Sequence, residues 1–268
     1  MAPQTPTLPN TPYKRRFQNL RTITALILRE MSSTYGRSPG GYIWAVIEPV
    51  LLIVVMAVAF SLLLRSPSLG TNFVLFYATA MMPFRMYQEC QSVTSSAVRY
   101  SQALLVYPVV SFADALLARV ILAFLKQAMV SYLVLGGIIM VLDVRLVLDF
   151  GPILISFVLA ALLGFGVGSL NCLLFDMFPV WKSLFSAATR PLMIMSAIIY
   201  IYEDVPRIAQ DFLWYNPLAH ISGLVRTGFY DYYQPTYISI IYVVLIALFT
   251  LCGGLLLLRR HYRKLMVL

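Results

Sequence analysis

The sequence has 268 residues, of which 60% are apolar and 12% are charged, whereas a soluble domain carries about 25% charged residues. No water-soluble fold of this size covers so much apolar surface, so the composition excludes an ordinary soluble domain. The net charge of +9 does not indicate nucleic-acid binding, because the Lys and Arg residues gather at the ends of apolar blocks and not along one exposed face.

The N-terminal part of the chain is predicted to contain a tail and a surface helix. Residues 1–12 hold four prolines among Thr and Asn, a composition typical of a disordered tail. In residues 13–35, apolar residues recur every three or four positions between cations, which predicts an amphipathic interfacial helix on a membrane surface. The first apolar block begins only near Ile43, too late for a cleaved signal peptide, so we expect the N-terminus to be retained.

Six apolar blocks follow, each long enough to cross a bilayer as a helix of about 20 residues. They predict an all-α integral membrane protein with a single six-helix transmembrane domain over residues 36–268. The predicted spans are residues 43–64, 72–98, 116–142, 152–175, 183–202 and 236–258.

The distribution of positive charge predicts the orientation of these spans. With the N-terminus inside, 12 Lys and Arg residues fall in the tails and inner loops, and four fall in the outer loops. The positive-inside rule therefore predicts that both termini are cytoplasmic.

Two of the loops are long enough to have structure of their own. The inner loop, residues 99–115, is moderately apolar around Pro108 and predicts a short helix at the membrane face. The outer loop, residues 203–235, is too aromatic for a solvated loop and too polar to span. It predicts a re-entrant helical pair before the last span, broken near Asn216 and Pro217.

Ionisable residues inside spans are costly and are therefore functional candidates. Arg85 and Glu89 are four residues apart and can pair on one helix face. Lys126 and Arg190 have no acid nearby on their own helix, so each either faces a polar lumen or pairs with an acid such as Glu48 on another helix. The full set is Glu48, Arg85, Glu89, Arg119, Lys126 and Arg190.

Aromatic residues near the span ends have two interpretations. They form the interfacial belt of a membrane protein, or they provide a stacking track for sugar rings. These residues are Trp44, Tyr77, Tyr87, Tyr200, Tyr202 and Trp214.

Other motifs indicate packing and not chemistry. Gly164 and Gly168 form a small-xxx-small face for helix packing, and the three cysteines have no metal-binding spacing. A nucleotide-binding P-loop motif is absent from the sequence, so an ATP-driven role requires a separate ATPase. Ser169 and His220 are the only candidates for an intramembrane protease, and Ser169 lacks the glycine that follows a rhomboid serine.

Several separated segments resemble one family. Residues 35–49 read YGRSPGGYIWAVIEP, residues 178–182 read FPVWK, residues 190–191 read RP, and residues 214–233 read WYNPLAHISGLVRTGFYDYY. Together with the inner loop, these segments resemble the membrane (permease) subunit of ABC-2 type capsular polysaccharide exporters of Gram-negative bacteria. The resemblance covers nearly the whole chain after the tail.

This resemblance implies a homodimer that binds two cytoplasmic ABC ATPase subunits and forms a channel for a lipid-linked polysaccharide across the inner membrane. It implies no cofactor or metal in this chain, with ATP and Mg on the partner, and further partners among periplasmic and outer-membrane export proteins. The implied substrate-translocation residues are Trp44, Glu48, Arg85, Lys126, Arg190, Tyr200, Tyr202 and Trp214. The implied ATPase-coupling residues are Arg29, Glu30, Tyr35, Arg37, Tyr100, Leu104, Tyr107, Pro108 and Asp114.

Alternatives to a capsular exporter remain. O-antigen and teichoic-acid exporters share the WAVIEP-like and NPL-like segments. A drug exporter of this type more often has a large outer domain between its first two spans, whereas about seven residues connect them here. The distant alternatives are an intramembrane enzyme and a membrane scaffold.

Overall fold

The computed structural model describes residues 18–35, 41–63, 66–102, 111–142 and 147–265, and this part of the chain forms helices and no strand. The all-helical architecture is therefore as predicted. The helices are α1 (Gln18–Tyr35), α2 (Gly41–Leu63), α3 (Phe73–Ser95), α4 (Ala97–Tyr100), α6 (Phe112–Leu142), α7 (Phe150–Met177), α8 (Pro179–Met195), the 3-10 turn η1 (Tyr202–Asp204), α9 (Arg207–Trp214), α10 (Pro217–Phe229) and α11 (Ile240–Leu265).

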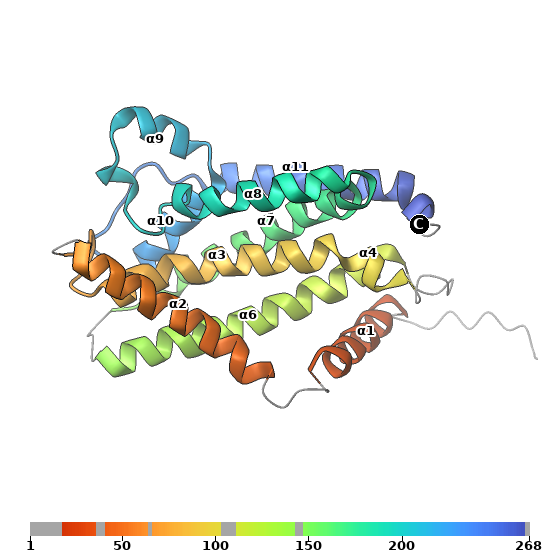
Figure 1. Cartoon of the computed structure of the whole chain (residues 1–268), viewed down its shortest axis with the longest axis horizontal. Helices are drawn as coiled ribbons and strands as arrows, with labels where there is room; N and C mark the ends of the chain where they lie inside the picture. Colours follow the sequence, from red (N-terminus) through yellow and green to blue (C-terminus); the bar gives the residue numbers. More distant parts are fainter. Residues whose placement is uncertain (1–17, 36–40, 64–65, 103–110, 143–146, 266–268) are drawn as a thin grey trace, which may run out of the picture.

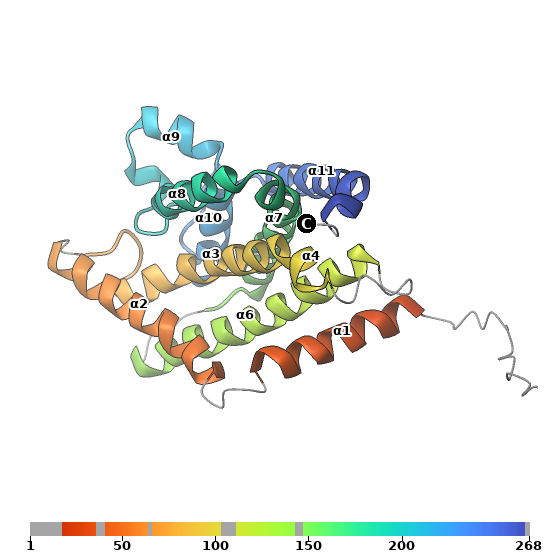
Figure 2. The ribbon, with the colours of Figure 1, turned by 45° about the vertical axis from the view of Figure 1, so that its right-hand side comes forward.

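The long helices lie roughly along one axis of the molecule (Figure 1). The start of α1, the short helix α4 and the end of α11 lie together at one end, which we call the α4 end. Helix α9, the end of α2 and the start of α3 lie at the opposite end, which we call the α9 end (Figures 1 and 2). Helix α1 runs outside the bundle beside α6 (Figure 2).

Among the described residues, three helices are long and apolar enough to cross a membrane: Phe112–Leu142, Phe150–Met177 and Ile240–His261. Helix α2 contains a shorter apolar stretch, Val46–Ala59. The predicted spans in α3 and α8 coincide with helices that carry charged residues. A count of six spans and a membrane re-entry of α9 and α10 stay predictions.

The fifth predicted span is too long at its C-terminal end. It was expected to reach residue 202, but α8 ends at Met195. Ala197 has a φ of +53°, in the left-handed region where a helix cannot continue, and it turns the chain out of α8. Tyr200 and Tyr202 therefore lie beyond this helix.

Helix α7 is the centre of the packing, and its glycines allow the neighbouring helices to approach closely. A Cβ atom at Gly164 would lie 2.6 Å from the backbone oxygen of Tyr87 in α3, and one at Gly168 would lie 2.8 Å from that of Gln91. On the other side, a Cβ atom at Gly166 would lie 2.6 Å from the backbone oxygen of Ala247 in α11. The predicted packing role of Gly164 and Gly168 is confirmed.

Gly164→Ala is expected to destabilise the purified protein by about 1–3 kcal/mol, because the new methyl group meets backbone atoms that cannot move independently. Gly137→Ala in α6 is the matched control, since a Cβ atom there has nothing within 4 Å and alanine favours the helix. Thermal melting in detergent compares the two variants. Equal melting temperatures would show that the α3–α7 contact has room for a methyl group at position 164.

Candidate functional site

Several charged residues of the helices form ion pairs with residues of other helices. Arg85 in α3 pairs with Glu48 in α2, with 3.0 Å between Nη2 and Oε1. Lys126 in α6 pairs with Glu89 in α3. The expected pair between Arg85 and Glu89 within one helix is therefore wrong. Each side chain reaches a neighbouring helix that supplies the opposite charge, which offsets part of the cost of placing a charge among apolar helices.

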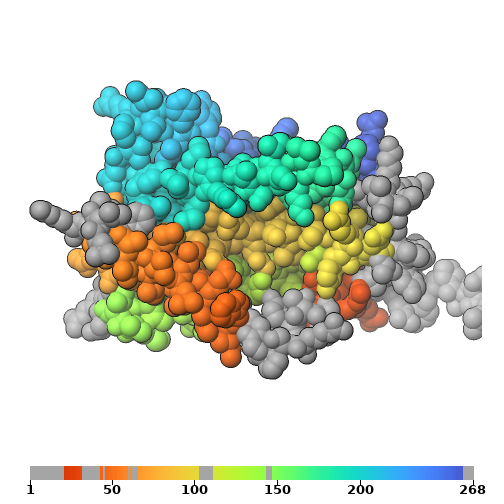
Figure 3. Space-filling view, viewed as in Figure 1, coloured from red at the N-terminus to blue at the C-terminus, as the bar shows by residue number. Residues whose placement is uncertain are grey.

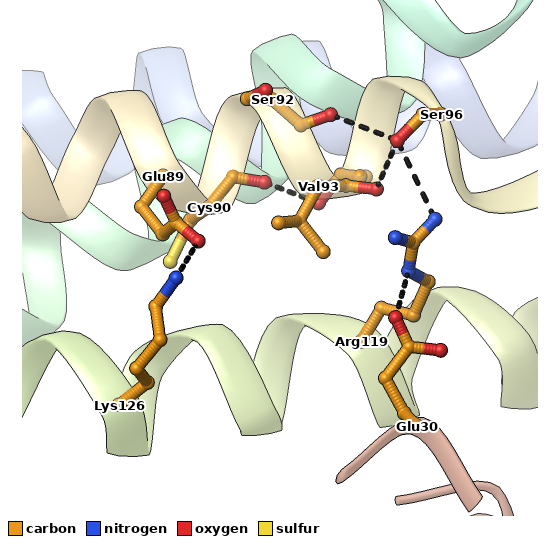
Figure 4. A network of polar contacts seen from close by, with 9 residues as sticks. Glu30, Glu89, Cys90, Ser92, Val93, Ser96, Arg119 and Lys126 are labelled. Carbon is orange, nitrogen blue, oxygen red and sulfur yellow. Dashed lines mark hydrogen bonds and ion pairs between the residues drawn. The ribbon is translucent and has the colours of Figure 1, made fainter. Parts of the chain in front are cut away.

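Arg119 in α6 connects α1 to the bundle (Figure 4). Its Nε lies 3.1 Å from Glu30 Oε1 in α1, and its Nη1 donates to Ser96 Oγ at the end of α3. The guanidinium also lies 4.3 Å from the centre of the Tyr100 ring in α4. Glu30 and Tyr100, both predicted coupling residues, thus meet at an arginine that the sequence did not assign to this role.

A polar cavity of about 630 Å³ lies between α3 and α8. Figure 3 shows the face on which these two helices run side by side, with α2 next to α3. Helix α8 has no buried residue, so one wall of the cavity is a helix that is open to its surroundings. The cavity is lined by Gln88, Gln91, Ser92, Ser95, Ser96, Arg99, Phe175, Asp176, Lys182, Phe185, Ser186, Thr189, Arg190 and Met193.

The cavity carries more positive than negative charge. Arg99, Lys182 and Arg190 line it against a single carboxylate, Asp176, which pairs with Arg99. Gln91 also lines the cavity, and its buried side-chain nitrogen has no hydrogen-bond partner among the described residues. Cations, hydroxyls and amides in one elongated space can bind an anionic, hydroxyl-rich molecule through many weak contacts.

Of the eight predicted translocation residues, only Arg190 lines this cavity. Glu48, Arg85 and Lys126 are engaged in the ion pairs, and Trp44 is exposed on α2. A spacing signal could have identified the lining. Lys182, Ser186 and Arg190 recur every four residues along α8, as Gln88, Ser92 and Ser96 do along the opposite wall, so each set shares a helix face.

Three aromatic residues of the predicted translocation set, Tyr200, Tyr202 and Trp214, contact other protein groups at the α9 end. The Tyr202 ring stacks on Tyr237 with 4.0 Å between ring centres, and Trp214 contacts Tyr242 at 4.9 Å. The Tyr200 hydroxyl donates to the backbone oxygen of Ile194. None of the three predicted residues is among the lining residues of the cavity.

The same end holds a polar contact between two loops. Tyr233 donates its hydroxyl to Glu203 Oε2 at 2.9 Å. Burial raises the pKa of Tyr233, so the hydroxyl keeps its proton and remains a donor at physiological pH. This bond ties the segment after α8 to the segment before α11.

The predicted coupling residues have different surroundings. Asp114 accepts from the backbone nitrogen of Ser111, and the Ser111 hydroxyl accepts from that of Ala113, so these two side chains form a cap at the start of α6. Arg29 is exposed on α1, and Tyr35 is the last residue of that helix. Arg37, Leu104, Tyr107 and Pro108 lie outside the described residues.

Ser169 and His220 do not form a catalytic pair. The Ser169 hydroxyl donates to the backbone oxygen of Phe165, one turn earlier in α7. His220 Nδ1 accepts from the backbone nitrogen of Ser239, so Nε2 carries the proton and donates to the backbone oxygen of Trp214. Both side chains have structural hydrogen bonds on different helices.

Sequence comparisons identify the family of this chain. The profile described as "ABC-2 type transporter" matches residues 21–230. The chain is 25% identical over 238 residues to the polysialic acid transport protein KpsM of Escherichia coli, covering 89% of this chain and 92% of the relative. It is 23% identical to the capsule polysaccharide export inner-membrane protein CtrC of Neisseria meningitidis serogroup A, covering 88% of this chain and 89% of the relative. It is also 23% identical to the capsule polysaccharide export inner-membrane protein BexB of Haemophilus influenzae, covering 89% of this chain and 90% of the relative. The profile match covers more than half of the sequence, and we conclude that this chain belongs to the ABC-2 type transporter family.

Proposed function

We propose that this chain is the channel-forming inner-membrane subunit of an ATP-driven exporter of lipid-linked capsular polysaccharide. Three relatives match this chain nearly end to end. One is named as a polysialic acid transport protein, and two are named as capsule polysaccharide export inner-membrane proteins. The observation that carries the proposal is the cavity beside α8, whose three cations and many hydroxyl and amide groups suit an acidic sugar polymer.

The proposed assembly is a homodimer with one ATPase bound to each copy. Helix α8 has no buried residue, and α2 exposes Ile43, Val50, Leu51, Val54 and Val55. A second copy packed against this face would cover the apolar part of α2 and close the open side of the cavity. The ATPase would bind near α1 and α4, where Glu30, Arg119 and Tyr100 meet.

The proposed topology has six spans, both termini in the cytoplasm and a membrane re-entry formed by α9 and α10. The start of α1 and the end of α11 lie at the α4 end, which supports an even number of spans (Figure 1). The α4 end is then cytoplasmic, and the α9 end faces the periplasm.

A deletion strain tests the proposed function. Loss of the gene is expected to remove capsular polysaccharide from the cell surface and to leave lipid-linked polymer inside, and the intact chain is expected to restore export. Glycan and lipid analysis of whole cells and of the surface fraction measures both. Loss of O-antigen or of teichoic acid with an intact capsule would contradict the proposal and identify the polymer that is moved.

A further inference from the structure

The chain leaves α8 through a buried bend that is not helical. Ser196, Ala197 and Ile198 are each 1% exposed or less, and Ala197 is the residue with positive φ. Buried backbone carbonyls outside regular structure need donors from elsewhere, since an unpaired buried carbonyl is unfavourable. The groups that donate to this bend therefore decide where α8 ends.

Arg226 of α10 supplies most of these donors. Its Nη1 donates to the backbone oxygens of Ala197 and Tyr200, both at 2.8 Å, and its Nη2 donates to that of Ile198 at 2.7 Å. Arg226 is 1% exposed, and its guanidinium lies 4.1 Å from the centre of the Phe76 ring in α3. No acid pairs with this arginine among the described residues. A buried charge is thus committed to three carbonyl groups.

The last carbonyls of α8 itself are also paired, one of them by α10. The Asn216 side chain donates to the backbone oxygen of Met195 at 2.9 Å, while its own oxygen accepts from the backbone nitrogen of Leu218 and caps α10. Tyr200 donates to Ile194, and Ser196 donates to Leu192 and Met193. The four carbonyls that a helix leaves unpaired at its C-terminus are all satisfied here.

Asn216 and Arg226, which we call the α10 clamp, hold a helix that has little other support. Helix α8 buries no residue and packs mainly against α7, whereas α10 is almost entirely buried between α7 and α3. The α9 end of α8 is therefore attached to a firmly packed helix by hydrogen bonds, beside the partly buried side chains of Leu192 and Met193, which pack against the core. Arg190 and Met193, which line the cavity, lie within two turns of this attachment.

We propose that the α10 clamp positions the α9 end of α8 and so sets the width of the cavity at that end. Arg226 and Asn216 are positioning residues, because they act on α8 and are absent from the cavity lining. A role in polymer export rests on the proposed function, but the position of α8 does not. When the clamp is intact, α8 can change its angle at the α4 end without losing its attachment at the α9 end.

Thiol labelling tests the proposal in membranes that contain the whole transporter. In a Cys252→Ser background, the two remaining cysteines are buried, so Met193→Cys and Lys182→Cys report on the two ends of α8 separately. Adding Arg226→Lys keeps the charge but loses the planar fork that reaches three carbonyls. We expect a water-soluble maleimide to label Met193→Cys at least about threefold faster, with little change at Lys182→Cys.

A second variant tests the proposal if substitution of the buried Arg226 prevents the protein from folding. Asn216→Asp keeps the oxygen that caps α10 but has no N–H for Met195, and it is expected to give the same selective increase. Arg207→Lys, at an exposed arginine of α9, is the matched control and should change neither rate. Equal increases at both ends of α8, or unchanged labelling of Met193→Cys in both clamp variants, would overturn the proposal. Selective labelling in a transporter whose deletion leaves the capsule intact would leave the clamp in place and contradict the proposed function instead.

Discussion

Arg190→Glu is expected to reduce the export of an acidic capsular polymer at least about tenfold, because it places a like charge in the path of a polyanion. Arg190 lines the cavity and forms no ion pair with another described residue. The substitution therefore leaves no buried partner charge without a counterion, and the stability of the folded chain should change by about 0.5 kcal/mol or less. The polymer on the cell surface and the amount of folded protein in the membrane are measured together.

Two further variants test whether the loss of export depends on the charge of residue 190 and on its place in the cavity. Arg190→Lys keeps the charge and should retain most of the export, whereas Arg207→Glu makes the same charge change on α9, outside the cavity, and should behave like the intact chain. Loss of folded protein in Arg190→Glu would assign the residue to structure. Normal export in that variant would exclude this cavity from the polymer path.

Arg119→Met is expected to destabilise the protein by about 3 kcal/mol, because it breaks a largely buried ion pair with Glu30. The two side chains are only 11% and 15% exposed, so water replaces little of the lost interaction. The same change removes the contacts with Tyr100 and Ser96 and detaches α1 from α6. Chemical denaturation in detergent measures the stability, and proteolysis of α1 measures the detachment.

A double-mutant cycle with Glu30→Gln isolates the pair. The two substitutions together should cost clearly less than the sum of the single ones, since each alone already breaks the interaction. Arg99→Met is the matched control, because Arg99 is 66% exposed and its partner Asp176 lines a cavity that also holds Lys182 and Arg190. Loss of Arg99 should therefore cost about 1 kcal/mol or less. Strictly additive effects of Arg119→Met and Glu30→Gln would show that α1 is held by other contacts.

The positions of the helices could be predicted from the sequence because they depend on long apolar blocks. The predicted spans at residues 116–142 and 152–175 overlap α6 and α7 almost completely. The end of α8 could not be predicted in this way. Apolar residues continue through Ile198 and Ile199. The turn there depends in part on the donors of Asn216 and Arg226, which lie about 20 and 30 residues further along the chain.

The site was harder to predict than the fold because a charged residue in a membrane span can either pair with another helix or line a cavity. Lys126 and Arg190 looked alike in the sequence, as single cations without an acid on the same helix. Glu89 pairs with Lys126 from another helix, and Arg190 faces the cavity. Which helix supplies an opposite charge is set by tertiary packing. The hydroxyl and amide residues of the cavity carry no charge, so the pattern of ionisable residues in the spans does not indicate them.

The ion pairs also bear on how the chain is inserted into the bilayer during synthesis. In the proposed topology α3 carries Arg85 and Glu89 into the membrane, and each unpaired charge costs about 2.5–3.5 kcal/mol at the centre of a bilayer. Their counterions are on α2, which is made earlier, and on α6, which is made later. Helix α3 alone would thus be a poor substrate for the translocon. It would have to wait at the exit site beside α2 until α6 emerges from the ribosome, so that the three segments partition into lipid as a neutralised group.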